Sequence, residues 1–190
     1  MNTLLRPLLV VFSGLTVLCC AVYPTLVTGI GAVAFPDQAA GSIVLRDGTP
    51  VGSRLIGQAF SAPEYFWGRP SATAPMPANA AASGGSNLGP TNPALLDAVK
   101  ARIDALKAAD PDNPAAIPVD LVSASASGLD PEISLAAAYF QAGRIARARG
   151  LAPDAVRSLI DRLGETPYLG LFGEPRVNVL ALNLALDAGR

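Results

Sequence analysis

Residues 8–30 read LLVVFSGLTVLCCAVYPTLVTGI, and no charged residue occurs anywhere from Pro7 to Pro36. A helix needs about 20 apolar residues to cross the hydrocarbon core of a bilayer. In lipid, a lone segment can pair all of its backbone groups only as a helix. We therefore expect a transmembrane anchor over residues 1–35, with Pro24 kinking or ending its helix toward the far side, followed by one soluble domain over residues 36–190.

The same N-terminal segment has a second interpretation, a cleaved signal peptide. Residues 32–34, AVA, match an A-x-A cleavage site, but the apolar core of a signal peptide spans about 7–15 residues and this one is roughly twice as long. An uncleaved anchor is favoured. Arg6 precedes the span, whereas Asp37 and Asp47 offset Arg46 beyond it. The positive-inside rule then predicts a cytoplasmic N-terminus and a domain on the outer side of the membrane.

Composition excludes several classes of function. The chain has no histidine, and Cys19 and Cys20 are its only cysteines, both within the apolar segment. Histidine-dependent triads, most zinc sites and a disulfide framework are therefore excluded. A net charge of −1 also disfavours nucleic-acid binding, which needs a basic face. The hydrophobic fraction of 51% is high, and a membrane segment accounts for the excess of apolar residues.

Beyond the anchor, the pattern predicts an α+β domain with a small hairpin-led sheet and three or four helices. Asp47-Gly48 is a turn dipeptide between two β-prone runs, and Asn92-Pro93 and Pro153 are helix-start signals. The C-terminal run fits a strand as well as a helix, and helix is preferred. The expected elements are a hairpin over residues 42–56, helices over 93–109, 131–149, 153–163 and 175–187, and a buried strand over 119–123.

The segment from Ser61 to Pro93 is rich in Pro, Ala, Gly, Ser and Asn, which predicts a long loop. Disordered linkers are poor in aromatic residues, yet this segment contains Tyr65, Phe66 and Trp67. We expect an ordered, packed loop that offers a contact surface rather than a flexible tether.

Three motifs have the residue types of a chemical site. Gly84 and Gly85 lie in SGGSNLGP, residues 83–90; this run lacks a Walker lysine, although Gly-rich backbone can form an anion nest. Gln141 and Arg144 are three apart on a predicted helix and share a face that could accept a nucleotide or a partner. Ser127 lies in a serine-rich turn but has no histidine to activate it. The more ordinary interpretations are a tight loop, a solvated helix face and a polar turn.

Six stretches resemble the KdpC family, the C subunits of bacterial Kdp potassium-transporting P-type ATPases. They are GSRLIGQ at 52–58, YF at 65–66, GRPSA at 68–72, ASGGSNLGPTNP at 82–93, VDLVSASASGLDP at 119–131 and GEPRVNVL at 173–180. Their order and spacing cover nearly the whole chain. Ser123 departs from the threonine expected there.

The resemblance implies a non-catalytic accessory subunit of an ATP-driven, high-affinity potassium importer, needed for assembly and stabilisation of the pump. Its partners would be a potassium-channel-like subunit, a P-type ATPase subunit and a small membrane subunit. No cofactor is expected to bind tightly. The alternative is a catalytic chaperone that raises the ATP affinity of the ATPase subunit, with low-affinity nucleotide contacts from Gln141, Arg144, Gly84 and Gly85. Independently of the resemblance, a membrane-tethered periplasmic hydrolase is the remote alternative. The expected partner-binding residues are Tyr65, Phe66, Trp67, Arg69, Ser71 and Asn87.

Overall fold

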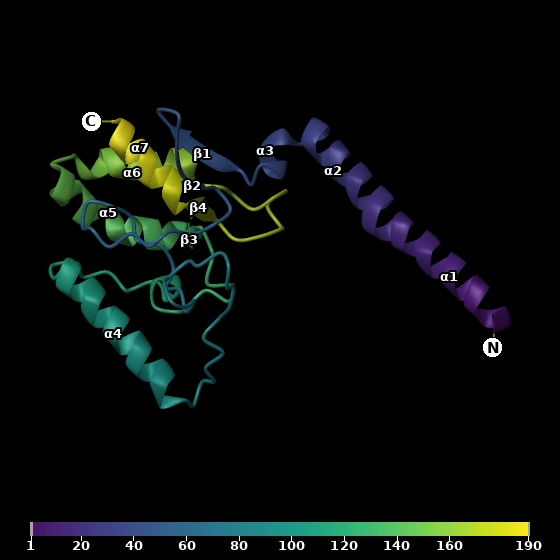
Figure 1. Cartoon of the computed structure of the whole chain (residues 1–190). Coiled ribbons are helices and arrows are strands. Elements are labelled where there is room, and N and C mark those ends of the chain that lie inside the picture. The colour runs from purple at the N-terminus through teal and green to yellow at the C-terminus, as the bar shows by residue number, and fades with distance from the viewer. Residues whose placement is uncertain (1, 190) are drawn as a thin grey trace. The chain divides into compact units, whose positions relative to one another are not determined.

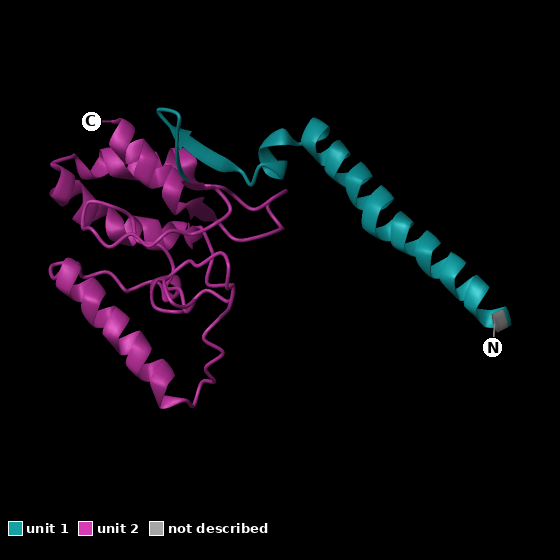
Figure 2. Ribbon diagram, in the orientation of Figure 1, with its two compact units in different colours: residues 1–51 teal, residues 52–190 magenta. Residues whose placement is uncertain are grey.

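A computed structural model describes residues 2–189 and confirms an α+β chain led by one long apolar helix (Figure 1). The chain forms two compact units, residues 1–51 and 52–190 (Figure 2). The first holds the N-terminal helical segments and the first strand of a hairpin. The second holds the remaining helices and its own hydrophobic core.

The N-terminal segment is helical from Asn2 to Ala34, and its Thr3–Ala34 portion is long and apolar enough to cross a membrane. Pro24 does not end this helix, contrary to one of the two expectations. Instead, a π-helical turn, η1 (Leu18–Val22), separates α1 (Asn2–Val17) from α2 (Tyr23–Ala34). Proline has no N–H, and its ring crowds the carbonyl four residues earlier. The wider turn fits that crowding, and the Tyr23 N–H bonds to the Leu18 carbonyl, five residues back.

After the short helix α3 (Pro36–Ala39), β1 (Ile43–Arg46) and β2 (Thr49–Ser53) form the predicted hairpin. Asp47 and Gly48 have φ of 51° and 76°. Positive φ at both central residues is the type I′ geometry that matches strand twist. The hairpin is a separate two-stranded sheet. A second sheet pairs β3 (Glu132–Ser134) with β4 (Arg176–Asn178) in antiparallel register, so the single sheet expected from the sequence is two.

Helix α4 (Pro93–Ala109) matches the prediction residue for residue, with the Asn92 side chain accepting from the Ala94 N–H at 3.0 Å. Its apolar residues Leu96, Val99, Ile103 and Leu106 recur at helical spacing, but this stripe is buried at only one end. Leu106 is buried, whereas Leu96 at the other end of the stripe is exposed.

Helices α5 (Leu135–Arg149), α6 (Pro153–Leu163) and α7 (Val179–Ala188) build the core of the second unit. Gly150 ends α5 in a left-handed conformation at φ 66°, as expected for a glycine C-cap. The C-terminal run is a helix, as preferred, but it starts at an Asn178 cap and not at Pro175.

Two other predictions for this region are wrong. Residues 119–121 form a 3-10 turn, η2 (Val119–Leu121), and not a strand, because the Asp120 carboxylate accepts from the Ser134 N–H at 2.7 Å. The helix predicted from residue 131 does not begin there, and Asp130 does not cap it. Asp130 accepts from the Glu132 N–H at 3.0 Å, and α5 begins only after β3, at a Ser134 cap.

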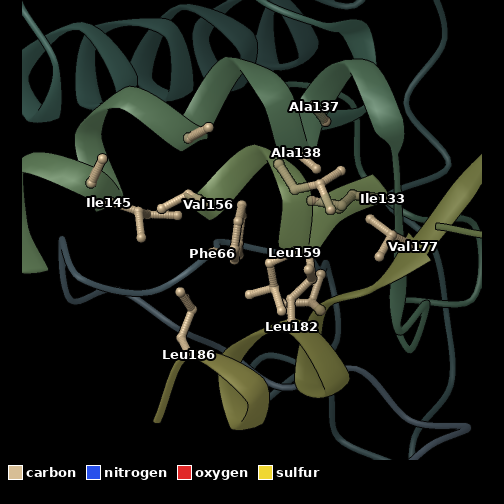
Figure 3. Packing of buried hydrophobic residues seen from close by; sticks show 14 of the residues in the cluster. Phe66, Ile133, Ala137, Ala138, Ile145, Val156, Leu159, Val177, Leu182 and Leu186 are labelled. Atoms are coloured by element: carbon tan, nitrogen blue, oxygen red, sulfur yellow. The ribbon is translucent and has the colours of Figure 1, made fainter. Parts of the chain in front are cut away.

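The core gathers apolar side chains from β3, β4, α5, α6 and α7 around a phenylalanine supplied by the long loop. Figure 3 shows Phe66 among Val156, Leu159, Leu182 and Leu186. The Phe66 side chain is 0% exposed. The loop between β2 and α4 is thus part of the core.

Candidate functional site

Two side-chain amides hold the long loop by the backbone of consecutive residues, Phe66 and Trp67. Asn183 on α7 accepts from the Phe66 N–H at 2.8 Å and donates to the Phe66 carbonyl at 3.0 Å. Gln141 on α5 does the same for Trp67, at 2.8 and 3.1 Å. Each primary amide presents a donor nitrogen and an acceptor oxygen side by side, so each pairs with the N–H and C=O of one loop residue as a neighbouring strand would. We call these four residues the amide clamp.

Two arginines on α5, Arg144 and Arg149, also hold this loop by hydrogen bonds to its carbonyl groups. Arg144 donates to the carbonyls of Pro63 and Tyr65 and to the Gln141 Oε1, and its guanidinium lies 4.4 Å from the centre of the Trp67 ring. Burial lowers the pKa of Arg144 to about 10. A buried guanidinium needs such partners, because an unpaired buried charge is costly.

Arg149 makes the equivalent contacts one turn further along α5. Its Nε donates to the Glu64 carbonyl at 2.7 Å, and Nη2 pairs with Asp187 at 2.9 Å. Its guanidinium carbon also lies 4.9 Å from the centre of the Tyr65 ring, and the Tyr65 hydroxyl donates to Asp187 at 3.3 Å. Tyr65 and Trp67 are half-buried as a result.

These contacts change the interpretation of three predicted site residues. Gln141 and Arg144 do share a face of α5, but the side chains are 1% and 4% exposed and their polar atoms bind the chain's own loop. The Phe66 side chain is fully buried in the core, and partner contact by this residue stays a prediction. Tyr65 and Trp67 keep part of their surface exposed, and partner contact by them stays a prediction.

The Gly-rich segment packs its backbone against the serine-rich turn. The Gly84 N–H donates to the Ser127 carbonyl at 2.8 Å, so it is already used within the chain. A Cβ on Gly85 would lie 2.7 Å from the Ala126 carbonyl oxygen. Gly128 has φ +69°, and a Cβ there would meet Thr73 and Gly84 at 2.5 and 2.7 Å. Close approach of two backbones therefore accounts for Gly85 and Gly128.

Arg69 and Ser71 tie the other end of the loop to the same turn. Arg69 pairs with Asp130 at 2.9 Å, and the Ser71 hydroxyl donates to the Gly128 carbonyl at 2.7 Å. A cavity of about 200 Å³ lies beside them, lined also by Gly57 and Gly68. Asn87, the last of the predicted partner-binding residues, is exposed with φ 51°.

The serine-rich turn is held together by hydrogen bonds of its own serine side chains. Ser125 and Ser127 share a hydrogen bond at 3.3 Å, and their hydroxyls accept from the N–H groups of Gly128 and Leu129. Within residues 2–189, no three His, Cys, Asp or Glu side chains are grouped so that they could hold a metal ion. The geometry around these serines is that of a hydrogen-bonded turn and gives no activated nucleophile.

Sequence reasoning missed Asn183 and Arg149 as members of this site. Asn183 had a signal: it is a single amide in the apolar run VLALNLAL, residues 179–186, and a polar residue at such a position needs a buried partner. Arg149 had none, because an arginine in the last turn of a helix is ordinarily explained by the helix dipole.

Comparisons with known proteins are consistent over the full chain. The family model described as "KdpC: K+-transporting ATPase, c chain" matches residues 5–188. The Potassium-transporting ATPase KdpC subunit of Janthinobacterium sp. (strain Marseille) is 66% identical over 187 residues, covering 98% of this chain and 99% of the relative. That of Polaromonas naphthalenivorans is 68% identical over 188 residues, covering 99% and 96%. That of Methylibium petroleiphilum is 66% identical over 190 residues and covers both chains fully.

Proposed function

This chain belongs to the KdpC family of K+-transporting ATPase c chains, and from that premise we propose that it is a non-catalytic accessory subunit that assembles and stabilises the pump. The observation that carries the proposal is the amide clamp. The side chains best suited to bind a nucleotide, Gln141 and Arg144, are committed to holding the loop.

The division of labour follows from what the sequence lacks. It contains neither a Walker lysine motif nor the Asp-Lys-Thr-Gly-Thr signature of a phosphorylated pump. One apolar helix also cannot enclose a pore. The proposed partners are therefore a channel-like potassium-selective subunit, a P-type ATPase subunit and a small membrane subunit, which between them hydrolyse ATP and select the ion.

The proposed arrangement places the N-terminus in the cytoplasm and the soluble domain outside the inner membrane, because Arg6 precedes the span and Asp37 and Asp47 offset Arg46 after it. Alkaline phosphatase and a fluorescent protein, fused separately after Arg190, test this. An active phosphatase with a dark fluorescent fusion is expected. The reverse pattern would place the domain in the cytoplasm and favour the nucleotide chaperone.

Nucleotide binding is the second test. MgATP titrated into the full-length chain in mild detergent should give, by calorimetry, a dissociation constant no tighter than about 1 mM, or about −4 kcal/mol. Micromolar binding would overturn the proposal. Loss of that binding in Gln141→Ala would not by itself locate the nucleotide, since this substitution also removes part of the amide clamp.

Assembly itself is tested by co-purification. Tagged full-length chain, extracted from its own membrane in mild detergent, should bring the other pump subunits with it. Deletion of residues 1–35 should abolish their recovery, because the small side chains Gly14, Thr16 and Gly29 suit packing against other membrane helices. Full recovery without the helix would show that the anchor plays no part in assembly.

A further inference from the structure

The loop between α6 and β4 presents four large apolar side chains to solvent. These residues, which we call the apolar tip, are Tyr168, Leu169, Leu171 and Phe172, with exposed fractions of 73%, 74%, 81% and 66%. Residues 166–173, TPYLGLFG, contain no charge, and Glu165 and Glu174 bracket them. Apolar side chains clustered in this way on a folded domain mark an interaction surface.

The backbone holds the apolar tip in one conformation. Tyr168 and Phe172 exchange backbone hydrogen bonds at 2.8 and 3.0 Å, and Leu169 and Gly170 turn the chain between them with φ of 55° and 71°. A leucine in the left-handed region is unfavourable, and here it directs a large side chain outward from the turn. Preorganisation of this kind lowers the entropy lost on binding.

The base of the loop is anchored as firmly as its end. Glu165 and Arg176 exchange backbone hydrogen bonds at 2.8 and 3.1 Å. The Arg176 side chain bridges Glu132 at 3.1 Å and Glu165 at 3.4 Å. The loop is visible in Figure 1 as the yellow-green trace that leaves the helices of the second unit and returns to β4. It projects its apolar residues from a fixed support.

We propose that the apolar tip inserts into the interfacial layer of the same bilayer that holds the N-terminal helix. Residues 35–51 join the end of α2 to the second unit and span at most about 60 Å even when fully extended. The domain therefore always lies within reach of the membrane surface. Tyrosine, phenylalanine and leucine are the residues that favour the boundary between headgroups and acyl chains.

The charges around the apolar tip indicate which kind of lipid surface it binds. The tip is uncharged and bracketed by Glu165 and Glu174, so electrostatic attraction cannot drive it toward anionic lipid. Binding to a zwitterionic surface through apolar burial is the remaining route. The tip then gives the domain a second membrane contact, which fixes its orientation over the bilayer. This inference requires an inserted helix and does not depend on the proposed assembly role.

Depth-dependent fluorescence quenching tests the inference in the full-length chain. Phe172→Trp is placed in the otherwise native protein, which is reconstituted in phosphatidylcholine vesicles, and vesicle-bound chain is collected by flotation. Vesicles with and without brominated acyl chains are then compared. The native chain supplies the background from Trp67, and Met76→Trp is the matched control because Met76 is also exposed, at 59%, but lies in a different loop.

Emission from Phe172→Trp should fall by about two-fold or more in brominated vesicles, as expected for an indole at the acyl boundary, and Met76→Trp should not respond. Adding Leu171→Glu to Phe172→Trp should remove most of the quenching, whereas Met76→Glu should leave it unchanged. Quenching equal to that of the Met76 control would overturn the inference and assign the apolar tip to a protein partner.

Discussion

Truncation of Gln141 to alanine should destabilise the soluble domain by about 3 kcal/mol. The Gln141 Oε1 accepts from the Trp67 N–H and from Arg144 Nη2, both at 2.8 Å, and Nε2 donates to the carbonyls of Trp67 and Ala137 at 3.1 and 3.2 Å. Gln141→Ala leaves Trp67 and the buried Arg144 short of partners. Each unsatisfied buried group costs about 1–3 kcal/mol, and the partial exposure of Trp67 offsets some of this cost because water can reach it.

Trp67 itself reports the result, because it is the only tryptophan in the chain and lies in the clamped loop. We expect urea unfolding of the full-length chain in mild detergent, followed by tryptophan fluorescence, to show a midpoint lowered by about 1.5 M if the urea slope is about 2 kcal/mol/M. Gln38→Ala, an exposed glutamine on α3, is the matched control and should unfold with the native protein.

Asn183→Ala sharpens the test because Asn183 holds the adjacent residue, Phe66. Once one amide is lost, the loop should loosen and the second truncation should cost less, so the double variant should be destabilised by less than the sum of the singles. A Gln141→Ala midpoint equal to that of the native chain would refute a structural role for the clamp. A nucleotide-binding role alone would give that result together with weakened ATP binding.

Three further predictions concern stability. Gly128→Ala should cost about 2–3 kcal/mol, since it adds a Cβ at φ +69° within 2.7 Å of a carbonyl, while Gly89→Ala, with open space around it, should be nearly neutral by the same urea assay. Burial raises the pKa of Glu132 above its ordinary value, and the nearby Arg176 opposes this rise. The folded state therefore binds the Glu132 proton more tightly than the unfolded state does. The stability that this protonation contributes is lost as pH rises. Glu132→Gln should therefore gain stability relative to the native chain between about pH 4 and pH 7, and a constant difference across that range would contradict this. Asn178→Ala removes the cap on the Ala181 N–H and should cost about 1 kcal/mol, which an unchanged melting midpoint would exclude.

Some element boundaries set by local signals were predictable to the residue. Helix α4 begins where Asn92-Pro93 provides a cap and a first helical residue, and α5 ends where Gly150 takes up the left-handed conformation. The type I′ turn at Asp47-Gly48 is likewise a property of two adjacent residues. In each case the interactions that decide the structure lie within one turn of the chain, so the sequence contains them.

Strands β3 and β4 could not be found in this way. Each has three residues, too few to show a period of two, and they form only because Ile133 meets Val177 across the sheet. The 3-10 turn at Val119–Leu121 depends in the same manner on Asp120 reaching Ser134. These elements depend on partners far away in the sequence, and local propensity carries no information about them.

The candidate site likewise combines features that the sequence determines with features that depend on contacts between distant segments. The sequence by itself determined the apolar N-terminal helix, the family, the ordered character of the aromatic loop, and the common helix face of Gln141 and Arg144. Only the tertiary structure decided what that face meets. It meets the chain's own loop, because a primary amide in a dry core needs a donor and an acceptor together, and the backbone of Trp67 supplies both. Periodicity places a side chain on a face of a helix, but whether that face binds a ligand or the rest of the protein depends on how distant segments pack against it.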